Sequence, residues 1–132
     1  MSHEPVRAAV VGVGSLGQQH ARVYSELEGV ELVGVFDADA KTARQVAKKC
    51  RTRVFESLDE VTREADAASV AVPTDRHRGI AGGLIEAGLH LLVEKPIAAT
   101  TAEAEELVAL ARRHDVILQV GHIERFNPVL SA

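Results

Sequence analysis

The sequence predicts an α/β fold in which helices cover both faces of a doubly wound parallel sheet. Short apolar runs alternate with segments of helical spacing along the chain. The apolar runs are nearly continuous, as at residues 8–11 and 91–93, which is typical of strands buried on both faces. Strands that alternate with helices in this way form right-handed crossover units, and such units build a parallel sheet.

The individual elements follow from this alternation in chain order. Strands are predicted at residues 6–11, 30–36, 67–72, 89–93 and 116–120, with a short one near 53–55. Helices are predicted at residues 15–27, 40–50, 57–64, 76–87 and 102–113. The sequence contains no internal repeat, low-complexity segment or linker. We therefore expect residues 1–121 to form one domain.

Polar residues next to the predicted helices support their boundaries. Asp39 is expected to cap the helix at 40–50, and Thr101 the last helix. Ser57 followed by Glu60 has the spacing of a capping box.

Glycines mark the helix predicted at 76–87. Gly88 is a favourable stop at its C-terminus. Gly82 and Gly83 lie inside it, where each is less favourable than alanine by roughly 1 kcal/mol. We expect close packing on the sheet to account for these two glycines.

A glycine-rich loop separates the first strand from the first helix. It contains Gly12, Gly14 and Gly17 in the pattern G-x-G-x-x-G. In a dinucleotide-binding unit these glycines permit a tight turn, close approach of the backbone to a pyrophosphate, and close packing of the helix on the sheet. The free N–H groups of a helix beginning near Ser15 would face the phosphates. The loop therefore predicts a Rossmann dinucleotide-binding fold.

An acidic residue, Asp37, closes the second apolar run twenty residues after Gly17. A carboxylate there accepts hydrogen bonds from both adenosine ribose hydroxyls and repels the 2′-phosphate of NADP, so NAD is the predicted cofactor. Lys41 and Arg44 lie just downstream and would approach a 2′-phosphate if the loop bends toward them, so NADP remains an alternative. An ordinary βαβ turn with an incidental acid is the other interpretation.

Ligands of a doubly wound sheet bind beyond the carboxyl ends of its strands, so the loops at that edge are candidate sites. Pro73, Thr74 and His77 follow the strand predicted at 67–72 and would line the path of the cofactor toward its nicotinamide. His77 is expected to cap or orient this loop. A histidine that merely starts a helix is the alternative.

Glu94, Lys95 and Pro96 directly follow the next apolar run. Adjacent residues leaving a strand point in different directions, so Glu94 and Lys95 need not form an ion pair. Lys95 would reach a substrate hydroxyl next to the transferred hydride, where it donates a hydrogen bond, steers the substrate or shuttles a proton. The Lys95–Pro96 bond is a candidate for the cis form. The alternative is a solvated strand end.

A third cluster of polar residues follows the strand predicted at 116–120, within residues 121–128. His122 lies where the reactive face of the cofactor is expected, and Arg125 would meet a phosphate or a substrate oxygen. The same segment is compatible with an interdomain hinge.

Composition limits the possible functions. Aromatic residues make up 3% of the chain and the net charge is −4, which argues against a nucleic-acid partner. The single cysteine, Cys50, excludes an intrachain disulfide and fits a reducing compartment. Neither a signal-peptide core nor a run of about 20 apolar residues is present, so we expect a cytoplasmic location and no membrane partner. We expect no metal site.

The order of these motifs resembles the Gfo/Idh/MocA family of NAD(P)-dependent oxidoreductases, from residue 6 to residue 130. The resemblance implies the Rossmann domain of a dehydrogenase that moves hydride between nicotinamide and a secondary alcohol of a sugar or nucleotide sugar. Lys95 would then be the catalytic lysine, and Glu94 would contact the nicotinamide ribose. The segment at 119–128 is similar to that of members related to UDP-N-acetylglucosamine 3-dehydrogenases. The expected cofactor-binding residues are Gly12, Gly14, Ser15, Leu16, Gly17, Asp37, Pro73, Thr74, His77, Glu94, Lys95, His122 and Arg125.

Members of this family carry further catalytic residues in a second α/β domain, and no residues here match them. Residues 122–132 are therefore expected to begin the connection to an absent C-terminal substrate domain, and this chain alone is expected to be inactive. Apolar surface near 94–96 and 121–130 would then be uncovered, so we expect a homo-oligomer. A non-catalytic dinucleotide-binding or sensing module is the alternative function, although it would not need Glu94, Lys95 and Pro96.

Overall fold

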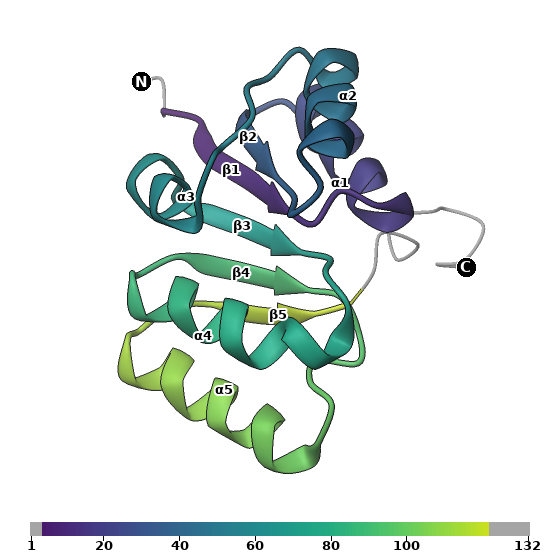
Figure 1. Ribbon diagram of the computed structural model, residues 1–132. Coiled ribbons are helices and arrows are strands. Elements are labelled where there is room, and N and C mark those ends of the chain that lie inside the picture. Colours follow the sequence, from purple (N-terminus) through teal and green to yellow (C-terminus); the bar gives the residue numbers. More distant parts are fainter. Residues whose placement is uncertain (1–3, 122–132) are drawn as a thin grey trace, which may run out of the picture.

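The sheet of this protein is fully parallel, as predicted. The computed structural model describes residues 4–121 (Figure 1). Five strands lie in the order β2-β1-β3-β4-β5. Their bounds are β1 Val6–Val11, β2 Val30–Phe36, β3 Ala67–Val70, β4 His90–Val93 and β5 Leu118–Val120. All adjacent pairs run parallel, so the five strands end at one edge.

Helices lie on both faces of the sheet (Figure 1). They are α1 Ser15–Glu26, α2 Ala40–Cys50, α3 Leu58–Glu64, the 3-10 helix η1 Thr74–Arg76, α4 His77–Glu86 and α5 Thr101–Arg113. Alternate residues of β1 divide between two apolar clusters, because successive side chains of a strand point to opposite faces. Val10 packs with residues of α1 and α2, whereas Val11 packs with residues of α3, α4 and α5.

The short strand predicted near residues 53–55 is absent from the described part of the chain. Val54 forms a single parallel bridge with Val35 and no longer pairing. Its neighbour Phe55 is buried, and a Cβ on Gly34 would lie 2.4 Å from the ring of Phe55. The packing of Phe55 over Gly34 in β2 thus explains why this segment is apolar, although the segment does not form a strand.

The predicted helix caps are correct at one helix and need correction at two others. Asp39 caps α2 by accepting from the N–H groups of Lys41 and Thr42. Ser57 caps α3 by accepting from the Glu60 N–H, but the Glu60 carboxylate accepts from the Glu56 N–H, so the reciprocal bond falls one residue earlier than a capping box requires.

The cap of α5 was predicted one residue too late. Thr100, and not Thr101, is the N-cap, and its hydroxyl accepts from the Glu103 N–H at 3.2 Å. Two consecutive threonines offer the same side chain, and residue 100 is the one with extended backbone ahead of the first turn.

The packing predicted for the two glycines inside α4 is also wrong. A Cβ on Gly82 would meet the Arg78 guanidinium at 2.4 Å and Leu110 of α5 at 3.7 Å, so its close neighbours are not the sheet. A Cβ on Gly83 would meet nothing within 4 Å. Gly88 does follow the helix with a φ of +92°, as its predicted role requires.

Candidate functional site

The carboxyl ends of β1 to β4 bring most of the predicted site residues to one edge of the sheet. Residues 12–17 follow β1, Asp37 follows β2, residues 71–77 follow β3, and residues 94–97 follow β4. Because the strands are parallel neighbours, these loops lie next to each other although they are up to 85 residues apart in the sequence. Figure 1 shows this edge at the tips of the arrows.

Close backbone contacts hold the glycine loop in place. Gly12 has a φ of +89°, and a Cβ on it would lie 2.7 Å from the carbonyl oxygen of Ala71. A Cβ on Gly17 would lie 1.7 Å from the carbonyl oxygen of Gly12. Gly17 therefore brings α1 against the turn itself, and a Cβ there would also lie 3.6 Å from the Cβ of Ala71, directly after β3. A Cβ on Gly14, by contrast, would meet nothing within 4 Å, so this side of the loop is open.

The N-terminus of α1 opens at the same place. Gly14 is its N-cap and supplies no side-chain acceptor, and the first turn contains no acidic residue. The first N–H groups of a helix have no acceptor within the helix, so those of Ser15, Leu16 and Gly17 are available to a ligand. An exposed helix N-terminus with a positive dipole end is a favourable place for a phosphate group.

Asp37 supports the glycine loop from the end of β2. Its Oδ2 accepts from the Val13 N–H at 2.8 Å, and its Oδ1 accepts from the Asp39 N–H at 2.9 Å. Each carboxylate oxygen accepts more than one hydrogen bond, so both retain capacity for ribose hydroxyls.

A hollow of about 210 Å³ lies between the glycine loop, Asp37 and the loop after β3. Gly12, Gly14, Pro73 and Arg76 are among the residues that line it. Arg76 was not among the predicted site residues. The sequence signal for it was its position as a basic residue in a loop that was already a candidate site.

Lys41 and Arg44, the two basic residues that would favour NADP, lie differently around Asp37. Arg44 lines an adjoining hollow of about 440 Å³ that also includes Asp37. Lys41 does not line that hollow and contributes its N–H to the Asp39 cap. Arg44 is thus the one of the two that shares a hollow with Asp37.

His77 joins two loops of the edge. Its ring is 1% exposed, with Nε2 at 2.8 Å from the Val72 carbonyl oxygen and Nδ1 at 3.0 Å from that of Pro96. Nδ1 also lies 3.1 Å from the carbonyl oxygen of Ile97. The ring therefore orients the loop after β3, as one of the two interpretations expected, and acts on backbone groups inside the protein.

Glu94 and Lys95 leave the end of β4 in different environments. Glu94 is 5% exposed, and its Oε1 lies 2.5 Å from Nε2 of His20 in α1. Lys95 is exposed, and within residues 4–121 the ion pair of Glu94 is with His20 and not with Lys95. The Lys95–Pro96 peptide bond is cis.

His20 is a residue that sequence reasoning missed. It is buried beside Glu94 although 74 residues separate the two in the sequence. The available signal was helical spacing: Gly17, His20, Ala21 and Tyr24 fall on one face of α1, which is the face turned to the sheet. A histidine on that face needs a polar partner, and the sequence did not indicate which.

The remaining predicted residues give no further geometry. His122 and Arg125, with the rest of the cluster at 121–128 beyond Gly121, lie outside the described residues. Gly121 itself is buried and donates its N–H to the carbonyl oxygen of Val93.

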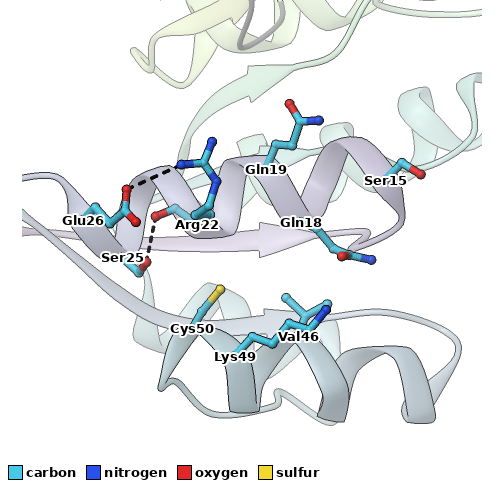
Figure 2. Close-up of a pocket in the computed structure, with 9 residues that line it drawn as sticks. All are labelled: Ser15, Gln18, Gln19, Arg22, Ser25, Glu26, Val46, Lys49 and Cys50. Carbon is cyan, nitrogen blue, oxygen red and sulfur yellow. Dashed lines mark hydrogen bonds and ion pairs between the residues drawn. The ribbon is translucent and has the colours of Figure 1, made fainter.

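A third surface hollow, of about 620 Å³, lies between α1 and α2 (Figure 2). Arg22 pairs with Glu26 there at 3.5 Å, and Cys50 ends α2 beside them. Burial raises the pKa of the Cys50 thiol, and the neighbouring Glu26 adds to that effect, so the thiol stays protonated. Within the described residues no group of three or more histidine, cysteine or acidic side chains is arranged to hold a metal ion.

None of the helices described within residues 4–121 is both long enough and apolar enough to cross a bilayer.

Known proteins resemble this chain along most of its length. A family model described as "Oxidoreductase family, NAD-binding Rossmann fold" (GFO_IDH_MocA) matches residues 6–122. UDP-N-acetylglucosamine 3-dehydrogenase of Acidithiobacillus ferrooxidans is 40% identical over 125 residues, which is 95% of this chain and 39% of that protein. Inositol 2-dehydrogenase 1 of Saccharopolyspora erythraea is 36% identical over 133 residues, 93% of this chain and 38% of that protein.

Solved structures agree with these similarities. The UDP-N-acetylglucosamine 3-dehydrogenase GnnA from Acidithiobacillus ferrooxidans superposes with a TM-score of 0.87 at 39% identity, covering 96% of this chain and 41% of the other. GenD2 from gentamicin A biosynthesis, crystallised in complex with NAD, superposes with a TM-score of 0.86 at 36% identity, covering 91% of this chain and 36% of the other.

The chain therefore belongs to the Gfo/Idh/MocA oxidoreductase family and has its NAD-binding Rossmann fold, which confirms the predicted family and fold. It spans about two fifths of the length of the curated relatives it matches.

Proposed function

We propose that this chain is the cofactor-binding domain of a dehydrogenase that transfers hydride between NAD and a secondary alcohol of a sugar or nucleotide sugar. The substrate class is supported by the relatives, which include a UDP-N-acetylglucosamine 3-dehydrogenase and an inositol 2-dehydrogenase. The observation that carries the proposal is the placement of the open glycine loop, Asp37 and the exposed Lys95 along one edge of a single sheet.

The residues present fit a dinucleotide. The space beside Gly14 is open where a Cβ would stand, and the uncapped N–H groups of α1 begin there. In our proposal the backbone N–H groups at Ser15, Leu16 and Gly17 bind the pyrophosphate. The Asp37 carboxylate accepts the hydroxyls of the adenosine ribose and disfavours a 2′-phosphate.

The other end of the edge would hold the reactive half of the cofactor. NAD, when bound, supplies a nicotinamide ring that accepts or donates hydride. Pro73 and Thr74 border its path, and Glu94 accepts a hydroxyl of the nicotinamide ribose. Lys95 donates a hydrogen bond to the substrate oxygen and holds or releases the proton that this oxygen exchanges. His122 and Arg125 remain predictions for contacts to the cofactor or the substrate.

The domain assignment is part of the proposal. Residues 1–121 would form the cofactor domain, with residues 122–132 beginning the connection to a substrate domain. The shares of the relatives that this chain covers, 39% and 38%, leave room for such a domain in those proteins. Homo-oligomerisation stays a prediction, which light scattering at high concentration would contradict by finding a clean monomer.

Calorimetric titration of the chain with NADH and then NADPH, at one ionic strength, tests the proposal. We expect NADH to bind and NADPH to bind more weakly. Replacing Asp37 with alanine should reduce NADH affinity and narrow the difference between the two cofactors, because the ribose acceptor and the repelling charge are both lost.

Asp115→Asn is a control for the loss of one negative charge. Asp115 follows α5, outside the loops at the carboxyl edge, so this change should leave NADH binding as it is. If the unaltered chain binds neither cofactor, the proposal that residues 1–132 contain the site is wrong.

A further inference from the structure

A line of buried polar side chains runs between α1 and the sheet and ends at Glu94. The Tyr24 hydroxyl lies 2.5 Å from the Ser69 hydroxyl in β3, and Ser69 lies 3.0 Å from Nδ1 of His20. The other ring nitrogen of His20, Nε2, meets Glu94 Oε1. His20 and Ser69 are 2% and 0% exposed, so water does not replace these bonds.

The donors and acceptors of this line match in one direction. With His20 as the tautomer that carries its proton on Nε2, Tyr24 donates to Ser69, Ser69 donates to Nδ1 of His20, and the Nε2–H donates to the Glu94 carboxylate. Burial raises the pKa of the Tyr24 phenol; the Glu94 carboxylate adds to that rise, and the bond to Ser69 opposes it. The phenol thus remains a donor at neutral pH.

The apolar neighbours of this line make its presence informative. The same face of β1 and β2 packs on α1 and α2 through side chains such as Val10 and Val35. Apolar residues at positions 20 and 69 would avoid the cost of desolvating polar groups, and buried polar networks are often no more stable than such replacements. Stability therefore does not explain why the line is polar.

The position of Glu94 does explain it. Its side-chain hydrogen bonds within residues 4–121 reach Oε1 only, and no buried side-chain oxygen in this part of the chain lacks a partner. Within the described residues the second oxygen, Oε2, accepts no hydrogen bond, and the Glu94 side chain as a whole is 6% exposed. One oxygen is held from inside while the other is left for a ligand, directly before Lys95.

We propose that His20 is a positioning residue for the cofactor: it holds Glu94 through Oε1 so that Oε2 accepts a hydroxyl of the nicotinamide ribose. This inference rests on the proposed function, since it names what that site requires at the end of β4. His20 itself makes no contact with the ligand and acts only through Glu94.

Two substitutions of His20 separate its two hydrogen bonds. The amide nitrogen of glutamine reaches about as far as Nε2, so His20→Gln keeps a donor for Glu94. The amide of asparagine reaches only as far as Nδ1, so His20→Asn keeps a partner for Ser69 and loses the bond to Glu94. Both variants place a polar side chain of similar character in the same buried site.

The readout is the affinity of the full 132-residue chain for NADH and for ADP, each measured by calorimetry. ADP contains the adenosine ribose and the diphosphate but lacks the second ribose. We expect His20→Asn to lose roughly tenfold in NADH affinity, as for one hydrogen bond to a charged group, with ADP affinity unchanged. His20→Gln should keep NADH affinity within about threefold of the original chain.

His90→Asn is the matched control, because His90 lies at the opposite end of β4 and accepts from the Ile117 N–H. It should leave both affinities unchanged. Equal losses of NADH and ADP affinity in His20→Asn would show a purely structural role and overturn the inference. So would unchanged NADH affinity in His20→Asn, or a loss in His20→Gln as large as that in His20→Asn.

The outcome also separates this inference from the proposed function. If the original chain binds neither NADH nor ADP, the proposed function fails and the inference fails with it. If the original chain binds both and the His20 variants do not differ between the two ligands, the positioning role alone is wrong.

Discussion

The two ends of the candidate site are held in place by different means. The glycine loop after β1 is held by backbone contacts so close that neither Gly12 nor Gly17 has room for a Cβ. The loop after β4 is held by buried side chains, with His20 bonded to Glu94 and His77 bonded to the carbonyl of Pro96. Close backbone contact restricts the residue type at one position, whereas side-chain contact restricts pairs of residues far apart in the chain.

This difference determines how each end should fail. A side chain added to the glycine loop produces a steric clash that the backbone must absorb. A side chain lost from the other end leaves buried polar groups without partners. The predictions below use these two kinds of failure to test the comparison, from the largest expected effect to the smallest.

Gly17→Ala should have the largest effect. The new Cβ would lie 1.7 Å from the Gly12 carbonyl oxygen, which is backbone and has no rotamer to adopt. We expect a loss of about 3 kcal/mol or more in the free energy of unfolding, measured by urea titration.

Gly14→Ala is the matched control within the same loop. Its φ is −69° and a Cβ would meet nothing within 4 Å, so the free energy of unfolding should change by less than about 0.5 kcal/mol. NADH affinity should nevertheless fall, because the Cβ enters the space proposed for the pyrophosphate. Equal stability losses in the two variants would contradict the account of the loop.

At the side-chain end, His77→Leu should destabilise by about 2 kcal/mol. Leucine fills much of the buried space, but the carbonyl group of Val72 or of Pro96, whichever the ring N–H serves, loses its donor. Thermal unfolding measures the effect. His114→Leu, at the exposed end of α5, provides the same change of residue type without a buried partner and should cost far less; equal losses in the two variants would refute the role given to His77.

The same difference explains which half of the site the sequence revealed. Gly12, Gly14 and Gly17 form a local pattern whose physical requirements are known in advance, so the loop, the helix after it and Asp37 were predicted from spacing alone. His20 pairs with Glu94 across 74 residues, and a single sequence contains no information on such a pair. Burial of Glu94 was hidden for the same reason, since a glutamate at a strand end is ordinarily exposed.

The errors in the predicted fold have local causes. The apolar residues near Phe55 predicted a strand, but they pack over Gly34 by side chain and pair by a single bridge. The parallel direction of the strands follows from the alternation of strands and helices along the whole chain, and that part of the prediction is correct. The exact start of α5 depends on one backbone angle, which spacing does not determine.

Thr100→Ala and Thr101→Ala test that start directly, near the side-chain end of the site. Loss of the Thr100 hydroxyl removes the acceptor of the Glu103 N–H and should lower the free energy of unfolding by about 1 kcal/mol. Thr101 lies in the first turn and caps nothing, so its replacement should change stability by only a few tenths of a kcal/mol. A larger loss of stability in Thr101→Ala than in Thr100→Ala, measured by urea titration, would show that Thr101 is the cap, as predicted from the sequence.

Asp39 provides the smallest effect, at the backbone-held end, where its N–H also donates to Asp37. The Thr42 hydroxyl and the N–H groups of Thr42 and Lys41 lower the pKa of the Asp39 carboxyl below its ordinary 3.8. A carboxyl whose pKa is lower in the folded than in the unfolded protein stabilises the folded state. This contribution is complete above the unfolded-state pKa and is lost as the pH falls through the folded-state pKa. Asp39→Asn keeps a capping acceptor that does not titrate. The stability difference between the original chain and Asp39→Asn should therefore be constant above about pH 5 and shift against the original chain below about pH 4. Urea midpoints measured across this pH range for both proteins test the prediction, because the other carboxyls titrate alike in the two proteins and their effects cancel. A stability difference that stays constant down to pH 3 would show that the charge of Asp39 does not stabilise this loop.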